Sequence, residues 1–480
     1  MRAIFYFRWV VVLALALGTQ LAAHATHILG GELTYAPIAS TTAGVPRYRL
    51  MATLFCNTSP GAAMQPTLLI SGTRTGCGSA AGSSFQVTVP IDQVVSTYSL
   101  GCPTAAGYFY NVLRYKTDVD LPAGQWVFSV AEAGRAPNVI NLVNSVYTNI
   151  YISAYLDNTL VGQNASPKFL STLLPYLCNG QAQRYSFSTF DSDGDSLVYQ
   201  FRQPEQAIIS APFACGTPIP GTLSPHFQLN ATTGALTAVP GPVQQGIYAM
   251  AARVSEYRRV SGSWQLIGYV TRDVSYFVVG SLNQNPHFTA LTLNGGTTPQ
   301  SPGQVIRVQP GQTVTLGLTA ADPDAGQVLR FESQSPGIIP GFSLQTTGAT
   351  TAQATWQVPA SLPPGRYTAA VAVLDNGCPN ASEDYTLSFL VAAQPLADRP
   401  ATTPGATAFP MPFREQVQFQ ASAGGQAVTV VDALGRVMAH LTSQADGRVR
   451  WQPAAALPAG LYLARGADGR LLARLLRAGE

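Results

Sequence analysis

The sequence predicts an all-β protein built from several tandem β-sandwiches. Its 480 residues exceed one ordinary domain, and a prior of about 150 residues per domain suggests about three to five units. Glycine (44) and proline (35) are spread along the chain without a fixed period, which is typical of β structure punctuated by turns. Hydrophobic residues make up 46% and charged residues 11%, a balance that favours packed cores and excludes a disordered charged chain.

The first 25 residues are typical of an export signal. Arg2 and Arg8 precede an apolar run over residues 9–17, and small residues close the segment. We interpret residues 1–25 as a Sec signal peptide, cleaved between Ala25 and Thr26. The apolar run is roughly half of the 20 residues that a bilayer requires, and no later stretch is long enough. We therefore expect a secreted or outer-membrane surface protein with no transmembrane segment in its mature chain.

Residues 26–160 predict an N-terminal β-rich module. Runs over residues 48–55, 85–89 and 126–130 are rich in residues that favour strands, and no helical period persists between them.

An internal repeat divides the middle of the chain into residues 161–281 and 282–391. Four landmarks recur in the same order: an Asn/Pro/Phe cluster, an Asp-x-Asp turn, a Phe-x-Leu run with Thr-Thr-Gly, and Gly-x-Tyr. The first copy opens at Asn164, Pro167 and Phe169 and closes at Gly246 and Tyr248; the second opens at Asn285, Pro286 and Phe288 and closes at Gly365 and Tyr367. Each copy alternates short strand-like runs with turns, so we expect two tandem β-sandwiches of roughly seven strands each.

The end of the chain forms a separate module. Residues 392–407 have no apolar period and indicate an extended linker. Residues 408–480 then carry four ordered motifs, the last of which is a basic final strand. The other three contain Pro410, Pro412 and Phe413; Asp432, Gly435 and Arg436; and Pro458, Gly460 and Tyr462. Gly435 and Gly460 stand where tight turns need positive φ, so the module is predicted to be a small β-sandwich.

This module resembles the type A C-terminal sorting domain of type IX secretion cargo from the Bacteroidota. The order and spacing of the motifs match, while Phe409 and Met411 replace the Tyr and Asn that are usual in the family. The resemblance implies that the module directs passage across the outer membrane by the type IX secretion machinery. It also implies removal by the sortase of that machinery, as the protein is fixed to the surface or released.

The front of the body is similar to the opening module of large Bacteroidota surface proteins. The similar residues include His27, Gly30, Gly31, Glu32, Tyr35, Leu121, Pro122, Trp126, Phe128, Asn138, Asn141, Tyr176, Cys178, Glu256, Arg258, Arg272 and Asp273. Such proteins often carry gliding-motility-associated or PKD-type repeats. This resemblance implies an architecture and a location, and it supplies no catalytic residue.

Export makes the cysteines candidates for disulfide bonds. The chain has six: Cys56, Cys77, Cys102, Cys178, Cys215 and Cys378. Proximity within a domain favours a bond between Cys178 and Cys215 and another among the first three, which leaves Cys378 over or paired across domains. Buried free thiols are the alternative.

Two acidic turns are candidate calcium sites. The first places Asp191, Asp193 and Asp195 at alternate positions, and the second repeats this spacing with Asp322 and Asp324. Oxygen ligands of this kind suit Ca²⁺, although the residues that follow exclude an EF-hand. A cadherin-like repeat, in which a paired-Asp turn and a further acid share the ion, is the better analogy. Completing ligands would be Glu256 in the first repeat, Asp375 in the second, and a carbonyl from Asn285 at the junction.

These residues also have simpler interpretations. Asp-x-Asp-Gly is a favoured turn, and Glu256 with Arg258, or Arg272 with Asp273, would form ion pairs on a sandwich surface. Aromatic residues, with Trp264 and Trp451 as examples, are expected in sandwich cores rather than on sugar-stacking platforms.

Motifs for catalysis and for nucleic-acid binding are missing from the sequence. The histidines lack metal-binding spacing, and no nucleophile elbow, phosphate loop or dinucleotide fingerprint occurs. The chain has two lysines, scattered arginines and a net charge of +3, which excludes a nucleic-acid binder. The sequence therefore predicts a non-enzymatic surface protein for adhesion, structure or binding. A polysaccharide-binding module and a hydrolase with two carboxylates brought together by folding are the alternatives.

Overall fold

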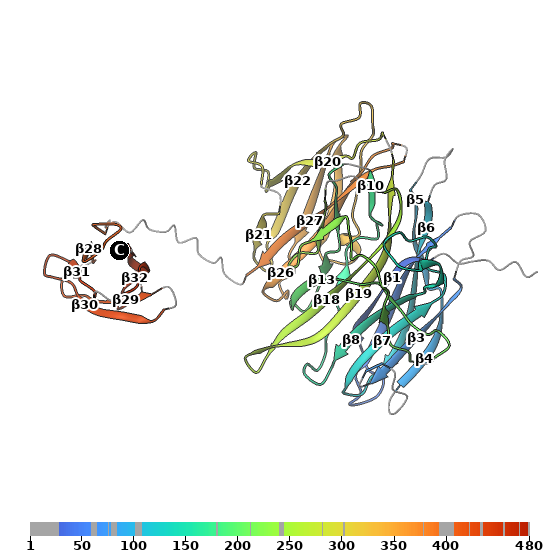
Figure 1. Ribbon diagram of the computed structural model, residues 1–480, viewed down its shortest axis with the longest axis horizontal. Coiled ribbons are helices and arrows are strands. Elements are labelled where there is room, and N and C mark those ends of the chain that lie inside the picture. The colour runs from blue at the N-terminus through green and yellow to red at the C-terminus, as the bar shows by residue number, and fades with distance from the viewer. Residues whose placement is uncertain are drawn as a thin grey trace, which may run out of the picture. The chain divides into compact units, whose positions relative to one another are not determined.

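The computed structural model describes most of the chain, and every regular element longer than three residues in that part is a β-strand (Figure 1). The predicted all-β fold class is confirmed. The described residues are 28–58, 65–74, 76–77, 84–100, 108–178, 181–211, 213–239, 244–280, 282–300, 303–377, 379–392, 408–421, 423–432, 435–454, 457–469 and 471–478. The predicted signal peptide with its cleavage site at Ala25 and Thr26, and residues 393–407 of the predicted linker, lie outside them.

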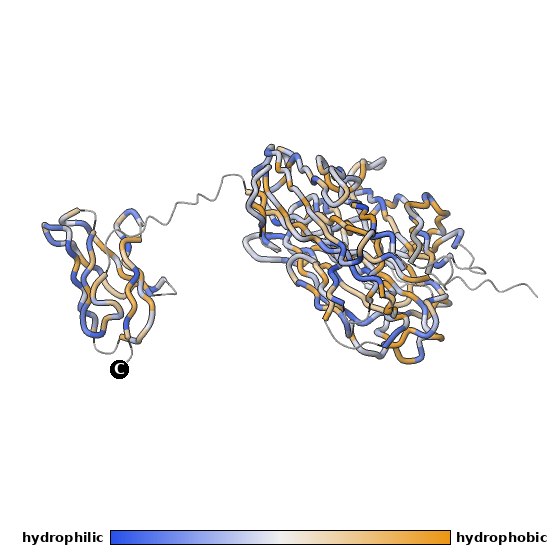
Figure 2. The backbone as a smooth tube through the Cα atoms, turned by 90° about the horizontal axis from the view of Figure 1, so that it is seen from above, coloured by the Kyte–Doolittle hydropathy of each residue, from blue (hydrophilic) through white to orange (hydrophobic). Residues whose placement is uncertain are grey.

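The chain divides into two compact units, Met1–Ala393 and Gln394–Glu480. The buried hydrophobic residues divide in the same way, into cores made by residues 28–391 and a core made by residues 413–475. Along the strands of both units, hydrophobic and hydrophilic residues follow one another closely (Figure 2). This alternation puts one face of each sheet inside.

Eight strands and one short 3-10 helix come from residues 28–157. They are β1 (Ile28–Ile38), β2 (Arg47–Asn57), β3 (Thr67–Arg74), β4 (Ser84–Pro90), β5 (Gln93–Leu100), β6 (Tyr108–Asp120), β7 (Gln125–Glu132), η1 (Ser145–Tyr147) and β8 (Ile150–Asp157). The three runs singled out in the sequence fall in β2, β4 and β7. In β2 the side chains of Tyr48, Leu50, Ala52 and Leu54 are buried, as a period of two requires.

The first repeat contributes eleven strands. They are β9 (Lys168–Phe169), β10 (Tyr176–Cys178), β11 (Arg184–Ser186), β12 (Thr189–Phe190), β13 (Ser196–Arg202), β14 (Glu205–Gln206), β15 (Thr217–Pro218), β16 (Phe227–Leu229), β17 (Ala235–Ala238), β18 (Gly246–Val260) and β19 (Ser263–Val279). The hairpin of β18 and β19 is its longest feature.

The first repeat does not form a domain separate from the N-terminal module, so the predicted boundary at 160/161 is wrong. Strand β19 pairs with β18 along its length, and it also pairs with β1 through Gly30 and Val274 and with β8 through Ala154 and Val270. These strands therefore belong to one 14-stranded sheet. Nine of them follow the order β4-β3-β7-β8-β19-β1-β2-β6-β5, and β10, β13, β14, β15 and β18 pair as branches from this order. A strand of 17 residues offers more edge than one sandwich uses, and the N-terminal strands occupy the remainder.

The two arms of this large sheet pack against each other. Strands β1 and β7 are not neighbours in the sheet, yet the rings of Tyr35 and Phe128 lie 5.8 Å apart. Both side chains are buried, and Trp126 stacks beside Phe128 at 6.5 Å. The arms thus form a sandwich whose core is continuous with that of the first repeat.

The second repeat is a sandwich of two four-stranded sheets. One sheet has the order β20-β22-β25-β24 and the other β21-β27-β26-β23. The elements are β20 (His287–Leu293), β21 (Val305–Val308), β22 (Thr313–Ala321), β23 (Arg330–Glu332), η2 (Ser335–Gly337), β24 (Phe342–Gly348), β25 (Thr351–Gln357), β26 (Gly365–Leu374) and β27 (Ser382–Val391). Trp356 and Phe389, 4.8 Å apart, join the sheets across the core.

The C-terminal unit is a smaller sandwich. A pair of strands, β28 and β31, accompanies a four-stranded sheet of order β30-β29-β32-β33. The strands are β28 (Val417–Gln420), β29 (Ala427–Asp432), β30 (Val437–Thr442), β31 (Arg448–Trp451), β32 (Gly460–Gly466) and β33 (Leu471–Arg477). Trp451 lies between Phe413 at 5.6 Å and Tyr462 at 5.5 Å and centres the core.

Candidate functional site

The first acidic turn links β12 to β13 and gathers its three carboxylates at one point. The backbone N–H of Asp193 donates to Asp191 Oδ1 at 2.7 Å, which closes the turn, and Gly194 supplies the positive φ of 78°. One oxygen from each of Asp191, Asp193 and Asp195 lies within 4.8 Å of the others. The three acids that the sequence singled out therefore lie together in the structure.

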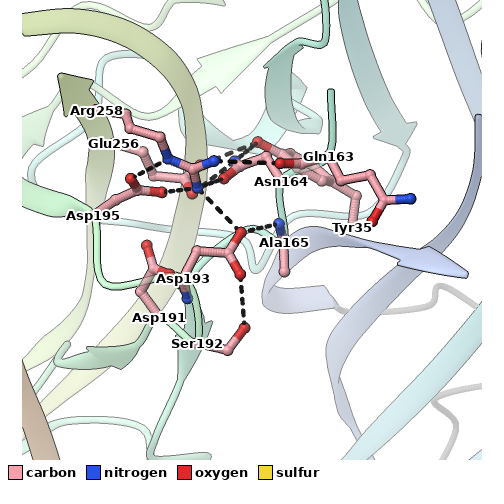
Figure 3. A network of polar contacts seen from close by, with 10 residues as sticks. All are labelled: Tyr35, Gln163, Asn164, Ala165, Asp191, Ser192, Asp193, Asp195, Glu256 and Arg258. Atoms are coloured by element: carbon pink, nitrogen blue, oxygen red, sulfur yellow. Dashed lines mark hydrogen bonds and ion pairs between the residues drawn. The ribbon is translucent and has the colours of Figure 1, made fainter. Parts of the chain in front are cut away.

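Arg258 of strand β18 neutralises two of the three carboxylates (Figure 3). Its Nε and Nη2 donate to both oxygens of Asp195 at 2.6 and 2.7 Å, and Nη2 also donates to Asp193 Oδ2 at 3.2 Å. The same Nη2 reaches Asn164 Oδ1 at 2.7 Å. Because the Asp195 side chain is 2% exposed, this bidentate pair is largely shielded from water.

Glu256 stands behind the turn and is fully buried. The hydroxyl of Tyr35 donates to Oε2 at 3.0 Å, and the Asn164 amide donates to Oε1 at 3.0 Å. Burial, and then the neighbouring charge of Asp191, raise the pKa of Glu256 well above its usual range. Glu256 forms no ion pair with Arg258 among the described residues, contrary to the simpler interpretation of the sequence.

Asp191 holds the one carboxylate of the turn that Arg258 does not bond. Its side chain is buried, and its Oδ2 atom has no hydrogen-bond partner. Burial, and then the charge of Asp195, raise the pKa of Asp191 to about 8. The turn therefore combines one acid with a raised pKa, Asp191, with two acids that an internal cation holds.

As arranged, these residues do not fit a calcium ion. Ca²⁺ takes six to eight oxygen ligands, whereas Arg258 occupies both oxygens of Asp195 and one of Asp193. The remaining oxygen of Asp193 receives the Ser192 hydroxyl at 3.4 Å. An ion would have to displace the guanidinium, so we derive no step of the function through calcium.

The second acidic turn is built from the same spacing with different partners. The N–H of Asp324 donates to Asp322 Oδ1 at 2.8 Å, and Gln284 donates to both oxygens of Asp324. Asp375 accepts from Asn283 at 2.9 Å and from the N–H groups of Gly377 and Ala381. Within the described part of the chain, Asp322, Asp324 and Asp375 do not converge as the first three do.

The junction amide that contacts an acid is Asn283, which the sequence interpretation missed. Asn285, the predicted ligand, instead accepts from Gln183 at 2.9 Å. Both asparagines are buried beside Pro286. The Asn-x-x-Pro pattern, which starts at Asn164 in the first repeat and at Asn283 in the second, was the signal that would have found Asn283.

Arg272 and Asp273 do not pair with each other and are not on the surface. Neighbouring residues of a strand point to opposite faces, so each finds its own partner. Arg272 donates to Glu32 at 2.6 Å with its guanidinium 4.0 Å from the ring centre of Phe169, and Asp273 receives both ends of Arg135 at 2.9 and 2.6 Å. These ion pairs join β19 of the first repeat to β1 and to the segment that follows β7.

The predicted disulfide between Cys178 and Cys215 is wrong, because Cys215 bonds Cys77. Their Cα atoms are 5.0 Å apart across a sequence separation of 138 residues. Proximity in sequence misled the prediction, since the large sheet brings the region after β3 beside the loop after β14. Cys56 is a buried free thiol, whereas Cys102 and Cys378 lie outside the described residues.

The two tryptophans expected in cores behave differently. Trp451 is buried as predicted, but Trp264 is 60% exposed near the tip of the β18–β19 hairpin. The side chain lines a cavity of about 250 Å³ together with residues of the first acidic turn and of β26. The prediction that Trp264 is a core residue is therefore wrong.

The motifs of residues 408–480 make the fold of the C-terminal unit. Phe413 is fully buried, and Gly435 adopts φ of 82° beside Asp432, whose carboxylate accepts from Arg436 at 2.6 Å. The Tyr462 hydroxyl donates to the Pro458 carbonyl at 2.7 Å, just before Gly460 opens β32. Pro410 and Pro412 are exposed.

The fold and these sites define an all-β chain of packed sandwiches, and the comparisons with known proteins add little to that. No family model matches the sequence, and no curated protein matches it. Within the described residues, no helix has the length and apolar character needed to cross a membrane.

Solved structures with some likeness include cadherin and immunoglobulin-type ectodomains. Human desmocollin-1 ectodomain shares 12% identity over 76% of this chain and 73% of that one, with a TM-score of 0.17. The eight N-terminal Ig domains of Down Syndrome Cell Adhesion Molecule share 11% identity over 94% and 56%, with a TM-score of 0.16. A nucleoside hydrolase-related hypothetical protein from Saccharophagus degradans, associated with carbohydrate metabolism, shares 18% identity over 23% of this chain and 26% of its own, with a TM-score of 0.17. Likenesses at these TM-scores carry no argument about function.

Proposed function

We propose that this chain is an exported, non-enzymatic surface protein whose body displays a binding face and whose C-terminal unit is its type IX secretion address. The observation that carries the proposal is the self-contained C-terminal sandwich, with its own core and with the ordered motifs at its core and turns. A removable address must fold apart from its cargo, and this unit has the architecture for that. The sorting role itself rests on the resemblance of the motifs.

The body has the features of a rigid display scaffold. Both repeats of the body carry the same corner, in which Tyr248 and Tyr367 each donate a hydroxyl hydrogen bond to the carbonyl four residues earlier. Buried ion pairs and one disulfide then lock the two halves of the body's large sheet together. Such a scaffold suits adhesion, structural support or ligand binding.

A carboxylate-dependent hydrolase is disfavoured by the cavities. Glycoside hydrolysis needs two carboxylates that face one bond. One cavity, of about 10 Å³, is lined by two acids, Glu332 and Asp384, but it has room for only about one water molecule. The cavity of about 250 Å³ is lined by one acid, Asp195, and the cavity of about 450 Å³ by one acid, Glu332. Both acids are ion-paired, with Arg258 and Arg330 respectively. We expect the purified protein to release no reducing sugar or peptide from a broad substrate panel, and reproducible turnover would overturn the non-enzymatic assignment.

Calcium belongs to this proposal only as a competitor of Arg258. The ion would stabilise the folded protein only if its binding free energy exceeded the free energy lost when the Asp195–Arg258 pair breaks.

Localisation of truncated and substituted chains tests the address. In a type IX-competent Bacteroidota strain, we expect deletion of residues 408–480 to leave the body in the periplasm. Phe413→Ala, which removes a fully buried side chain of the C-terminal core, should have the same effect. Gln418→Ala, at an exposed position of the same unit, is the matched control and should reach the surface normally. Surface display of the truncated chain at the normal level would overturn the proposal.

A further inference from the structure

Trp264 is an exposed tryptophan near the tip of the β18–β19 hairpin. Trp264 is 60% exposed, while Trp126, Trp356 and Trp451 are each at most 3% exposed. A large apolar ring held in water forgoes burial worth about 1.5–3 kcal/mol, so its position needs a reason. The guanidinium of Arg259 lies 5.9 Å from its ring centre and helps to hold it.

The ring lines a cavity of about 250 Å³ in the body of the protein. The other walls come from the first acidic turn with the start of β13, from Thr232 before β17, and from Pro364 to Arg366 at the start of β26. Segments from both repeats therefore build it. Gly365 and Gly194 approach so closely that a Cβ on Gly365 would lie 3.2 Å from the Gly194 carbonyl oxygen.

Hydroxyl groups dominate the polar lining of this cavity. Its buried wall includes Thr189, Tyr199 and Thr368, which bond one another through Thr189 at 2.7 and 2.8 Å. Ser196 and Thr232 are exposed at its margin. The exposed hydroxyls of Ser196 and Thr232 can both donate and accept, which matches the hydroxyl groups of a sugar.

One charged side chain of the cavity is available for a ligand. Arg366 is exposed, and no ion pair or hydrogen bond of its side chain is found among the described residues. The acid of the cavity, Asp195, is already neutralised by Arg258. The free guanidinium therefore favours an anionic ligand, and a planar carboxylate fits its paired donors best.

We propose that this cavity binds an acidic oligosaccharide, with a sugar ring on Trp264 and a uronate carboxylate on Arg366. The apolar C–H face of a pyranose ring covers an aromatic ring, while hydroxyls bond the polar walls and the carboxylate meets the guanidinium. This inference rests on the proposed binding function of the body and names its ligand class.

Fluorescence titration of the mature chain with tetragalacturonate is the direct test. Because Trp264 is the exposed tryptophan of the described residues, ligand binding should shift its emission to the blue and protect it from acrylamide. We expect Trp264→Ala to weaken binding about tenfold, measured by calorimetry, and Trp264→Phe to retain most of it. Arg366→Gln should weaken binding about tenfold or more and flatten its salt dependence.

Two controls make the outcome decisive. Tyr147→Ala, at a side chain that is 88% exposed in η1 and does not line the cavity, should bind as the unsubstituted chain does. Cellotetraose, a neutral tetrasaccharide, should bind more weakly; equal affinity would overturn the acidic specificity. Failure of tetragalacturonate to bind, or binding insensitive to Trp264→Ala, would overturn the site. If the protein with Trp264→Ala still attached to cell surfaces as the unsubstituted chain does, the site would also be overturned, but the proposed binding function of the body would stand.

Discussion

The two repeats share one strand plan but differ in what surrounds it. In the first, β13-β18-β19 is joined by β10 in parallel; in the second, β23-β26-β27 is joined by β21 in parallel. Strand β16 pairs with β17 as β24 pairs with β25. The continuous strand β22 is replaced in the first repeat by the two short strands β11 and β12.

The register places opposite charges at matching positions. Tyr257 pairs with the first residue of β13, and Leu374 pairs with the first residue of β23. The next residues are Arg258 in the first repeat and Asp375 in the second. One acidic turn thus faces an internal cation and the other faces a further acid with amide partners. Identical turn motifs therefore do not imply identical sites, because the strand behind the turn sets the charge.

The largest difference between the repeats should come from their ion pairs. Arg272→Met leaves the buried Glu32 carboxylate uncompensated between β19 and β1, and we expect a loss of about 3–5 kcal/mol in the free energy of unfolding. Arg330→Met in the second repeat breaks an exposed pair with Glu332 and should cost less than about 0.5 kcal/mol. Urea unfolding of both variants measures the two losses. Equal losses in the free energy of unfolding would contradict a stabilising role of the buried pair between β19 and β1.

Removal of the internal cation should come next. Arg258→Gln leaves Asp193 and Asp195 facing each other, and we expect a loss of about 2–4 kcal/mol without calcium. Millimolar Ca²⁺ should restore part of the melting temperature of this variant, since the freed oxygens converge, and should leave the unsubstituted chain unchanged. Asp324→Asn is the control in the second repeat. If Ca²⁺ raises the melting temperature of the unsubstituted chain equally, Arg258 is not the counter-ion.

A pH-dependent difference should follow at Asp191. An acid with a raised pKa in the folded state costs nothing below its unfolded pKa of about 4, and its full penalty applies above about pH 8. Stability should therefore fall as pH rises between these values. Asp191→Asn removes that fall, so its advantage should be near zero at pH 4 and should grow by up to about 1.4 kcal/mol per pH unit until about pH 8. Thermal unfolding across this range measures it, and a pH-independent difference would refute the buried neutral acid.

The smallest difference should come from the glycines of the two turns. Gly194 and Gly326 have φ of 78° and 84°, so alanine at either position should cost about 1 kcal/mol of backbone strain. A Cβ at Gly194 would also lie 2.9 Å from the Tyr367 hydroxyl, whereas nothing lies within 4 Å at Gly326. We expect Gly194→Ala to cost about 1 kcal/mol more than Gly326→Ala. Equal melting temperatures would show that the turn does not press on the second sandwich.

Local patterns predicted a good part of this structure. The Gly-x-Tyr landmarks that defined the repeat and the C-terminal motif are the places where a tyrosine hydroxyl bonds back to the chain. Likewise, the Asp-x-Asp spacing produced the same closed turn in both repeats. Such features depend on residues within about four positions of each other, so one sequence suffices to find them.

Features that depend on distant residues escaped prediction. The exposure of Trp264 and the disulfide of Cys77 with Cys215 depend on which segments the sheet brings together. An alternating pattern assigns a strand two faces but does not say whether a second layer covers each of them.

The sequence by itself determined the strand class, the repeat and the turns, since backbone preferences and short-range hydrogen bonds act within a few residues. Only the tertiary structure decided that β19 pairs with strands of both the first repeat and the N-terminal module, and that Arg258 enters the acidic turn. The partner of a strand edge, like the partner of a buried charge, is chosen by desolvation across the whole core, and the residues concerned are separated by 60 to 240 positions with no local sign of each other.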